Sequence, residues 1–248
     1  KADGFDLVDD FSDLFGMNAA GTDAKMRNTK ESILEAQFTP GAGNWCTWMF
    51  GRDLVNWNNN FTWAKWVTPS RDLISTFKQE GDEVRFKESV VYYDCGWSNY
   101  YPSDNYPFMY KCRSANSSII KYRYADVLLL KAEALIMQDT PDLEGAADII
   151  DEVRDRAKLG ALSSSTRSNK DALLNALLKE RRLELAFEGQ RWFDLVRLDK
   201  VEEVMNAVHA KDSGRKAQVY TYDKNSYRLP IPQSVIDAND KIHQNPGY

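Results

Sequence analysis

The chain is poor in the residues that build metal sites and disulfide frameworks. Its 248 residues include two histidines, His209 and His243, and three cysteines, Cys46, Cys95 and Cys112. Ligands so few and so scattered predict no transition-metal site, no cofactor and no disulfide framework. A single bridge in an oxidising compartment stays open, and the sequence does not say which two cysteines would form it.

A calcium ion held by oxygen atoms is the one metal that this composition leaves open. Asp9, Asp10 and Asp13 form a small acidic run near the start of the chain. The run lacks the regular ligand spacing of a calcium loop, so it predicts a solvated turn.

A basic surface, long apolar runs and nucleotide-binding motifs are also missing. The formal net charge is −5, and the Lys and Arg residues are interspersed with acids. This pattern predicts no binding to nucleic acid, which requires a basic stripe. No stretch reaches the roughly 18 apolar residues of a membrane-spanning helix, and the first residues lack the layout of a signal peptide. No glycine-rich phosphate loop or Ser/His/Asp set is visible either.

Tryptophan, in contrast, is abundant in one place. Six of the seven tryptophans fall within about fifty residues that are otherwise polar and rich in Asn. Large aromatic side chains often pin long loops to a domain, and we expect about half of these six to do so. The others match the flat apolar face of a pyranose ring, while the Asn, Asp and Arg side chains around them suit its hydroxyl groups.

We therefore predict a glycan-binding site on two aromatic loops. The candidates from the first loop, residues 41–69, are Trp48, Trp57 and Trp63. The candidates from the second loop, residues 96–110, are Trp97, Tyr100 and Tyr101, which would form a facing wall.

Residues 1–121 show little helical periodicity. Residues 32–38 alternate apolar and polar side chains, which predicts a half-buried strand with Leu34, Ala36 and Phe38 on one face. A short amphipathic helix is expected over residues 71–77, and a strand over residues 89–94.

Residues 122–248 predict a helical scaffold followed by an extended tail. Apolar side chains recur at helical spacing in residues 122–135 and 143–153, and Thr140 with Pro141 predicts the start of the second of these helices. This pair predicts an antiparallel hairpin of tetratricopeptide-like size. The remaining expectations are a polar loop at 163–170, helices at 171–188, 191–198 and 201–210, and an extended, proline-containing tail at 229–248.

The acids between Glu180 and Asp194 are a candidate active site. Glu180, Glu184 and Glu188 recur every four residues, so neighbouring carboxylates lie about 5–6 Å apart on one helix face. A retaining glycosidase uses a separation of about 5–5.5 Å. Arginines lie three residues from three of these acids: Arg181 from Glu184, Arg191 from Glu188 and Arg197 from Asp194.

Such pairing lowers carboxylate pKa values, whereas a general acid needs a raised pKa. We therefore interpret this stretch as a scaffold in which Phe187, Trp192 and Phe193 pack and the charges interlock.

Three motifs in order resemble the SusD/RagB family of outer-membrane glycan-capture lipoproteins. They are YRYADVLLLKAEAL at 122–135, ERRLELAFEGQRWFDLVRL at 180–198 and LPIPQSVIDANDKIHQNPGY at 229–248. The stretches FDLVDDFSDLF and NTKESILEAQF also look like the middle of that family. The resemblance implies a mainly α fold with short strands and long loops, a tetratricopeptide-like scaffold carrying the aromatic loops. Residues 1–248 would then be one C-terminal SusD-like domain.

The resemblance also implies a function and a location. The protein would be non-enzymatic, tethered to the outer membrane by an N-terminal lipid that lies outside this sequence, and face outward. It would deliver a bound glycan to a SusC-like TonB-dependent transporter. Because the family's N-terminal repeats are absent here, we expect the hairpin to expose an apolar face, and the chain alone to be marginally stable or to self-associate.

Two other function classes stay open at this point. One is a glycoside hydrolase that uses the acids of residues 180–194 or acids of the loops. The other is a helical-repeat scaffold that binds only protein, which would bury the tryptophan loops. The glycan and the partner transporter are not encoded in any motif that we recognise.

Overall fold

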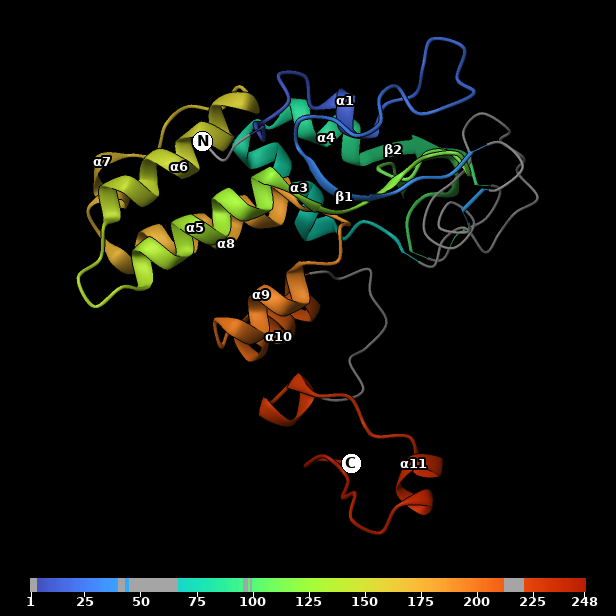
Figure 1. The fold of residues 1–248 in the computed structure, drawn as a ribbon, viewed down its shortest axis with the longest axis vertical. Helices are drawn as coiled ribbons and strands as arrows, with labels where there is room; N and C mark the ends of the chain where they lie inside the picture. The colour runs from blue at the N-terminus through green and yellow to red at the C-terminus, as the bar shows by residue number, and fades with distance from the viewer. Residues whose placement is uncertain (1–3, 40–42, 45–66, 96–97, 99, 212–220) are drawn as a thin grey trace. The chain divides into compact units, whose positions relative to one another are not determined.

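Figure 1 shows a computed structural model of the chain, which describes residues 4–39, 43–44, 67–95, 98, 100–211 and 221–248. The chain divides into two compact units, residues 1–190 and 191–248. Helices make up most of the described regular structure, and the described strands are short. This confirms the mainly α fold class.

Three helices form the main core of the first unit. They are α5 (Tyr124–Met137), α6 (Leu143–Arg156) and α8 (Lys170–Glu184), which pack against one another in Figure 1. Their inward faces contribute small and branched apolar side chains at helical spacing, which allows the helix axes to approach closely. The most deeply buried of these side chains are Ala125, Leu129, Ala132, Ile136, Ala146, Ala147, Ile150, Val153, Leu173 and Leu177.

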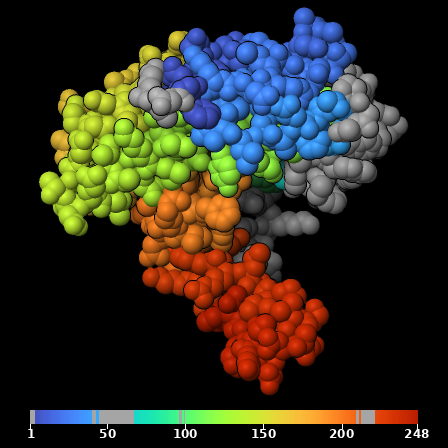
Figure 2. All heavy atoms as spheres, viewed as in Figure 1, coloured from blue at the N-terminus to red at the C-terminus, as the bar shows by residue number. Residues whose placement is uncertain are grey.

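The predicted apolar stripe of α5 was partly wrong. Val127 is 46% exposed and Leu130 is 38% exposed, although both belong to the apolar side chains at helical spacing in residues 122–135. The reason is that α5 is apolar on nearly all sides, so periodicity alone does not say which side faces the core. Atoms of α5, in green to yellow-green, form part of the surface in Figure 2. Whether a further helix covers this side stays a prediction.

The start of α6 also differs from its prediction. The side chain of Asp142, and not that of Thr140, caps the helix by accepting a hydrogen bond from the Gly145 amide at 2.9 Å. Both residues are good N-caps, and the proline between them does not decide which one is used.

A two-stranded antiparallel sheet lies beside the helical core. Strand β1 (Ser32–Ala36) pairs with β4 (Ile119–Arg123), and α5 begins directly after β4. The helix predicted from residue 122 therefore starts two residues later, because residues 119–123 are held by backbone pairing with β1. The predicted strand is confirmed, and Ala36 and Phe38 are half-buried as predicted, but Leu34 is 53% exposed, so the prediction was wrong for that residue.

Residues 70–109 contain more regular structure than the sequence pattern predicted. Helix α3 (Arg71–Glu80) runs three residues beyond the expected helix, and α4 (Glu83–Ser89) was not expected. Strand β2 (Val90–Tyr93) confirms the predicted strand. It pairs with β3 (Tyr106–Met109), so the second aromatic loop ends in a strand preceded by a short 3-10 turn, η2 (Ser103–Asn105).

Helix α8 ends at Glu184, four residues before its predicted end. Its last carbonyl accepts hydrogen bonds from the side chains of Lys111 at 2.8 Å and Arg123 at 2.7 Å. These donors replace the backbone amide that would continue the helix. The chain then turns through Phe187 and Gly189, which both adopt positive φ angles of 66° and 84°.

Two segments that were predicted to lack helices contain short ones. The polar loop 163–170 contains the short helix α7 (Ser164–Arg167), because the Ser163 side chain caps it. The predicted extended tail, residues 229–248, contains α11 (Gln233–Ala238), and η3 (Lys224–Tyr227) lies just before it. Pro232 immediately precedes α11, and a proline there costs no backbone hydrogen bond.

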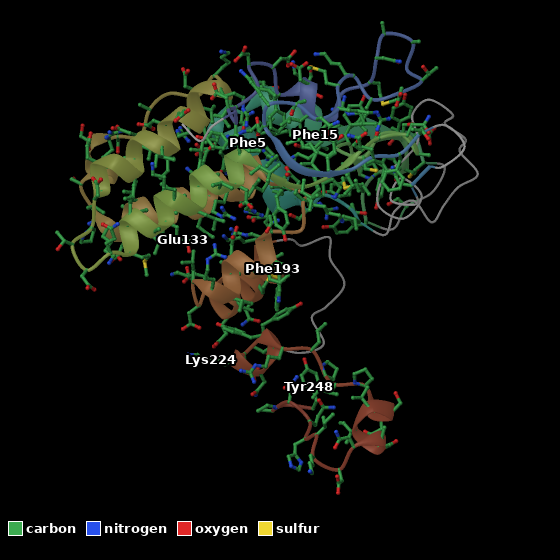
Figure 3. The ribbon with its side chains drawn as sticks, viewed as in Figure 1. Phe5, Phe15, Glu133, Phe193, Lys224 and Tyr248 are labelled. Atoms are coloured by element: carbon green, nitrogen blue, oxygen red, sulfur yellow. The ribbon has the colours of Figure 1, made fainter. Side chains whose placement is uncertain are left out.

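The second unit also contains α9 (Arg191–Arg197) and α10 (Val201–Lys211), both close to their predicted bounds. Phe193, labelled in Figure 3, is 64% exposed, so the prediction that it packs was wrong. Trp192 is half-buried and its ring centroid lies 6.4 Å from that of Tyr222. At the other end of the chain, the four-residue helix α1 (Ser12–Phe15) buries Leu14 and Phe15 in a small hydrophobic cluster.

Candidate functional site

The β2–β3 hairpin carries a cluster of aromatic side chains. Tyr106 and Phe108 lie on β3 with ring centroids 5.0 Å apart and are almost fully buried, together with Cys95 just after β2. Tyr101 packs on the same cluster, with its ring 5.7 Å from that of Tyr106. Burial raises the pKa of Tyr106, so its hydroxyl stays protonated and can act as both donor and acceptor.

Tyr100 and Tyr101, two of the predicted site residues, form an edge-to-face pair. Their ring centroids are 4.7 Å apart at an interplanar angle of 82°. Both rings are half-buried. The backbone amides of the two tyrosines donate to the Ser98 hydroxyl at 3.0 and 3.1 Å, and the Tyr101 hydroxyl donates to the Pro69 carbonyl at 2.9 Å. The two rings are therefore in contact, Tyr101 is also part of the packed cluster, and the role of both in glycan binding stays a prediction.

Arg71 joins this pair from the start of α3. Its guanidinium carbon lies 4.3 Å from the centroid of each tyrosine ring, and its Nη2 donates to the Tyr100 carbonyl. Thr68 contacts the same cluster, with 2.6 Å between its hydroxyl and that of Tyr106. Sequence reasoning missed both residues, because a separation of about thirty positions leaves no local signal.

The acids of residues 180–188 form a buried ion network instead of an open cleft. Glu184 is 0% exposed, and its carboxylate binds Arg85, Arg123 and Arg156, which belong to α4, β4 and α6. Glu188 binds Lys111 at 2.6 Å and Arg123 at 2.7 Å. The acids are paired, as predicted, but their cations come from distant elements, and Arg181 binds Asp126 on α5 at 2.8 Å. Of the three predicted local pairs, Arg197 with Asp194 is confirmed at 2.9 Å.

Burial and pairing set the pKa values of these groups in different directions. Burial alone would raise the pKa of Glu184, but Arg156, Arg123 and Arg85 outweigh it and hold that pKa well below its usual value. The pKa of Glu188 is lowered in the same way, against burial, by Arg123 and Lys111. Burial raises the pKa of Glu180, and Arg85 and Arg154 offset this only in part. The expectation of a lowered pKa was therefore wrong for Glu180.

A raised pKa is what a general acid needs, but Glu180 lacks the access that catalysis requires. It is 0% exposed, and its two oxygens contact Arg85 at 2.5 Å and Arg154 at 3.2 Å. No sugar can reach a carboxylate that is enclosed in this way. The arrangement suits a structural role.

Among the residues that the structure describes, no group of three or more His, Cys, Asp or Glu side chains could hold a metal. Within the same residues, no helix is long and apolar enough to cross a membrane. Cys95 and Cys112 are both buried and are not bonded to each other, and Cys46 lies outside the described residues.

Residues 101–248, more than half of the chain, match the model of the SusD family. The chain belongs to the SusD family. This confirms the resemblance that the three sequence motifs carried. The matched region begins at Tyr101 and includes the helical core, the tail and the buried ion network except for Arg85.

Two curated SusD-like proteins from Formosa agariphila resemble the chain in sequence. SusD-like protein P38 is 41% identical over 139 residues, which are 54% of this chain and 25% of that protein. SusD-like protein P2 is 34% identical over 142 residues, which are 55% of this chain and 27% of that protein. The aligned regions thus cover about a quarter of each of these SusD-like proteins.

Solved structures of the SusD superfamily share the fold over almost the whole chain. Surface glycan-binding protein A from Bacteroides thetaiotaomicron, in complex with laminarihexaose, matches with a TM-score of 0.71 and 19% identity, over 99% of this chain and 56% of that one. A laminarin-binding SusD-like protein matches with a TM-score of 0.64 and 24% identity, over 99% and 54% of the two chains. This chain therefore spans a little more than half of these SusD-like structures.

Four of the six predicted site residues of this SusD-family chain, Trp48, Trp57, Trp63 and Trp97, lie outside the described residues. The described residues next to them are anchored. Asn44 donates from its side chain to the carbonyls of Ala115 and Ser117, and Thr68 contacts Tyr106. The structure thus brings Tyr100 and Tyr101 together, and leaves the four tryptophans as predictions.

Proposed function

We propose that this chain is part of a surface protein that captures an oligosaccharide or polysaccharide without hydrolysing it. The observation that carries this proposal is the fold, which matches a glycan-binding protein in complex with laminarihexaose over 99% of this chain. Membership of the SusD family supports the same assignment.

The proposed site combines the Tyr100–Tyr101 pair with Trp48, Trp57, Trp63 and Trp97. Aromatic rings can cover the apolar face of a pyranose, and each ring contact releases ordered water at little entropic cost to a rigid side chain. Lost rigid-body freedom consumes much of this gain. We therefore expect micromolar to millimolar affinity, about −8 to −4 kcal/mol.

The finer parts of the proposal concern the cell surface. The full-length protein would be held at the outer membrane by an N-terminal lipid, face outward, and pass the glycan to a SusC-like TonB-dependent transporter. Family membership supports this location and this partner. Co-purification of the full-length protein with such a transporter from native membranes would test both.

Affinity electrophoresis against plant, host and microbial polysaccharides, laminarin included, tests glycan capture. The six variants with Ala at Trp48, Trp57, Trp63, Trp97, Tyr100 or Tyr101 are compared with the wild type. A suitable control is Tyr122→Ala, because Tyr122 is an exposed aromatic residue on β4, 55% exposed, and is not part of the proposed site.

Removing a ring that stacks on the sugar should weaken binding by about 1–3 kcal/mol, the range found when an aromatic side chain that stacks on a nucleic-acid base is removed. We expect slower migration of the wild type in at least one gel, and partial recovery of migration in two or three variants. Unchanged migration of the wild type in every polysaccharide, or equal retardation of all six variants, would contradict the proposed site.

A further inference from the structure

Arg71 occupies a fixed position that does not depend on the tyrosines it contacts. It is the first residue of α3, directly after Ser70, whose side chain caps the helix by accepting from the Leu73 amide at 3.1 Å. Helix α3 is anchored to α8 by an ion pair of 2.7 Å between Asp72 and Arg182. Leu73 and Phe77 of α3 also share a buried cluster with Leu183 of α8. The guanidinium therefore extends from a rigid part of the scaffold.

One planar cation contacts two rings that stand nearly at right angles. The guanidinium carbon is 4.3 Å from both ring centroids, and the rings are 82° apart. A cation over a ring face is attracted by the negative face of the ring, and Arg adds stacking by its flat group. The further hydrogen bond from Arg71 to the Tyr100 carbonyl fixes the backbone that carries the first ring.

We propose that Arg71 is a positioning residue that holds the Tyr100 ring in the orientation in which it stacks on a sugar. This inference rests on the proposed function. The guanidinium covers one face of each tyrosine ring, so a sugar cannot stack on that face. A ring that is already ordered before the sugar binds loses little conformational entropy on binding. The affinity is therefore higher.

The two tyrosine rings are held in place by different contacts. The Tyr101 ring packs on Tyr106, and its hydroxyl is bound by the Pro69 carbonyl, so the buried cluster already fixes it. Tyr100 forms the edge-to-face pair with Tyr101, and the Arg71 guanidinium lies over its ring. Arg71 links the orientation of Tyr100 to α3.

The test is a double-mutant cycle between Arg71 and Tyr100 in the full 248-residue chain. Isothermal titration calorimetry gives the affinity of wild type, Arg71→Met, Tyr100→Ala and the double variant for one polysaccharide that retards the wild type. Arg71→Lys keeps the charge but lacks the planar group. Asp142→Ala is the matched control, because it removes the N-cap of α6 and is not part of the proposed site.

We expect Arg71→Met to weaken binding about tenfold and Arg71→Lys by a smaller factor. In the Tyr100→Ala background, Arg71→Met should cause no further loss, because its effect passes through that ring. Asp142→Ala should lower the unfolding temperature and leave the affinity unchanged. If Arg71 had a purely structural role, the affinity losses of its variants would follow their losses in unfolding temperature. They would also add to the loss caused by Tyr100→Ala.

The outcomes separate this inference from the proposed function. If the wild type binds no polysaccharide, the proposed function fails. If the wild type binds and the two substitutions are additive, glycan capture stands and the role of Arg71 is refuted. If Arg71→Met does not fold, the same cycle with Arg71→Lys decides, since a lysine can keep the hydrogen bond to the Tyr100 carbonyl.

Discussion

The Glu184 side chain shows how much of this fold depends on one carboxylate. It binds three arginines from three elements and is completely buried. Removing one partner of a buried ion pair leaves the other charge without compensation in a medium of low polarity. The substitution Glu184→Gln would remove one negative charge and leave one positive charge of these arginines without compensation.

We therefore expect Glu184→Gln to lower the free energy of unfolding by about 3–5 kcal/mol. Urea denaturation followed by circular dichroism measures this. Glu144→Gln is the control, because Glu144 also binds an arginine, Arg167, but its side chain is 72% exposed. An exposed pair contributes roughly 0–1 kcal/mol, so the control should change little. Equal and small effects of both substitutions would mean that the network does not stabilise the fold.

Glu188 gives the stability of the fold a dependence on acid. Arg123 and Lys111 lower its pKa below the usual 4.5, although burial opposes this. An acid whose pKa is lower in the folded state contributes stability that is complete above the unfolded pKa and is lost as the pH falls toward the folded pKa. Burial raises the pKa of Glu180 and Asp82, so these two groups contribute with the opposite sign.

Comparison with Glu188→Gln isolates the part that belongs to Glu188. The free energy of unfolding of the wild type should fall below about pH 4.5 more steeply than that of the variant, so that the two curves converge in acid. Urea titrations at several pH values between about 3 and 7 provide both curves. Parallel curves would show that Glu188 ionises alike in the folded and unfolded chain.

At the scale of the elements, helix ends are where sequence and structure part most clearly. The interior of α6 follows its apolar spacing, with Ala146, Ile150 and Val153 all 0% exposed. Its first residue depends on a choice between two capping residues, Thr140 and Asp142, which local sequence does not settle. The end of α8 depends on Lys111 and Arg123, which are distant in the chain, so no local pattern could have placed it at Glu184.

The start of α6 can be tested directly. Asp142→Ala should lower the free energy of unfolding by about 1 kcal/mol, because it removes the acceptor for the Gly145 amide. Thr140→Ala should have almost no effect, since the Thr140 side chain is not the cap. Thermal unfolding of both variants measures the difference. A larger loss of stability from Thr140→Ala would show that Thr140 is the cap, as the sequence predicted.

The same reasoning explains what could be predicted of the candidate site. Tyr100 and Tyr101 were found because aromatic side chains in a polar loop are visible in the sequence itself. Arg71, Pro69 and Thr68 were not, since they reach the tyrosines only after α3 has packed on α8 and β2 has paired with β3. The exposure of Leu34 and Val127 was likewise invisible, because it depends on which side of an element meets the core.

At the scale of the whole molecule, the absence of catalysis is a prediction with a simple assay. Incubation of the protein with any polysaccharide that it binds should release no reducing ends. The reason is that the paired acids of α8 are enclosed by arginines and out of reach of a sugar. A reducing-end assay over a long incubation measures this. Release that disappears in a single carboxylate-to-amide variant would instead identify a glycoside hydrolase.

The ion network also has a consequence for how the chain folds. Glu184 lies 28, 61 and 99 positions along the chain from the arginines that bind it. A partly folded chain that has collapsed around α8 but has not yet placed α4, β4 and α6 would bury a carboxylate without its cations, which is unfavourable. The network should therefore form late and all at once, so that Glu184→Gln mainly speeds unfolding and hardly changes the rate of folding.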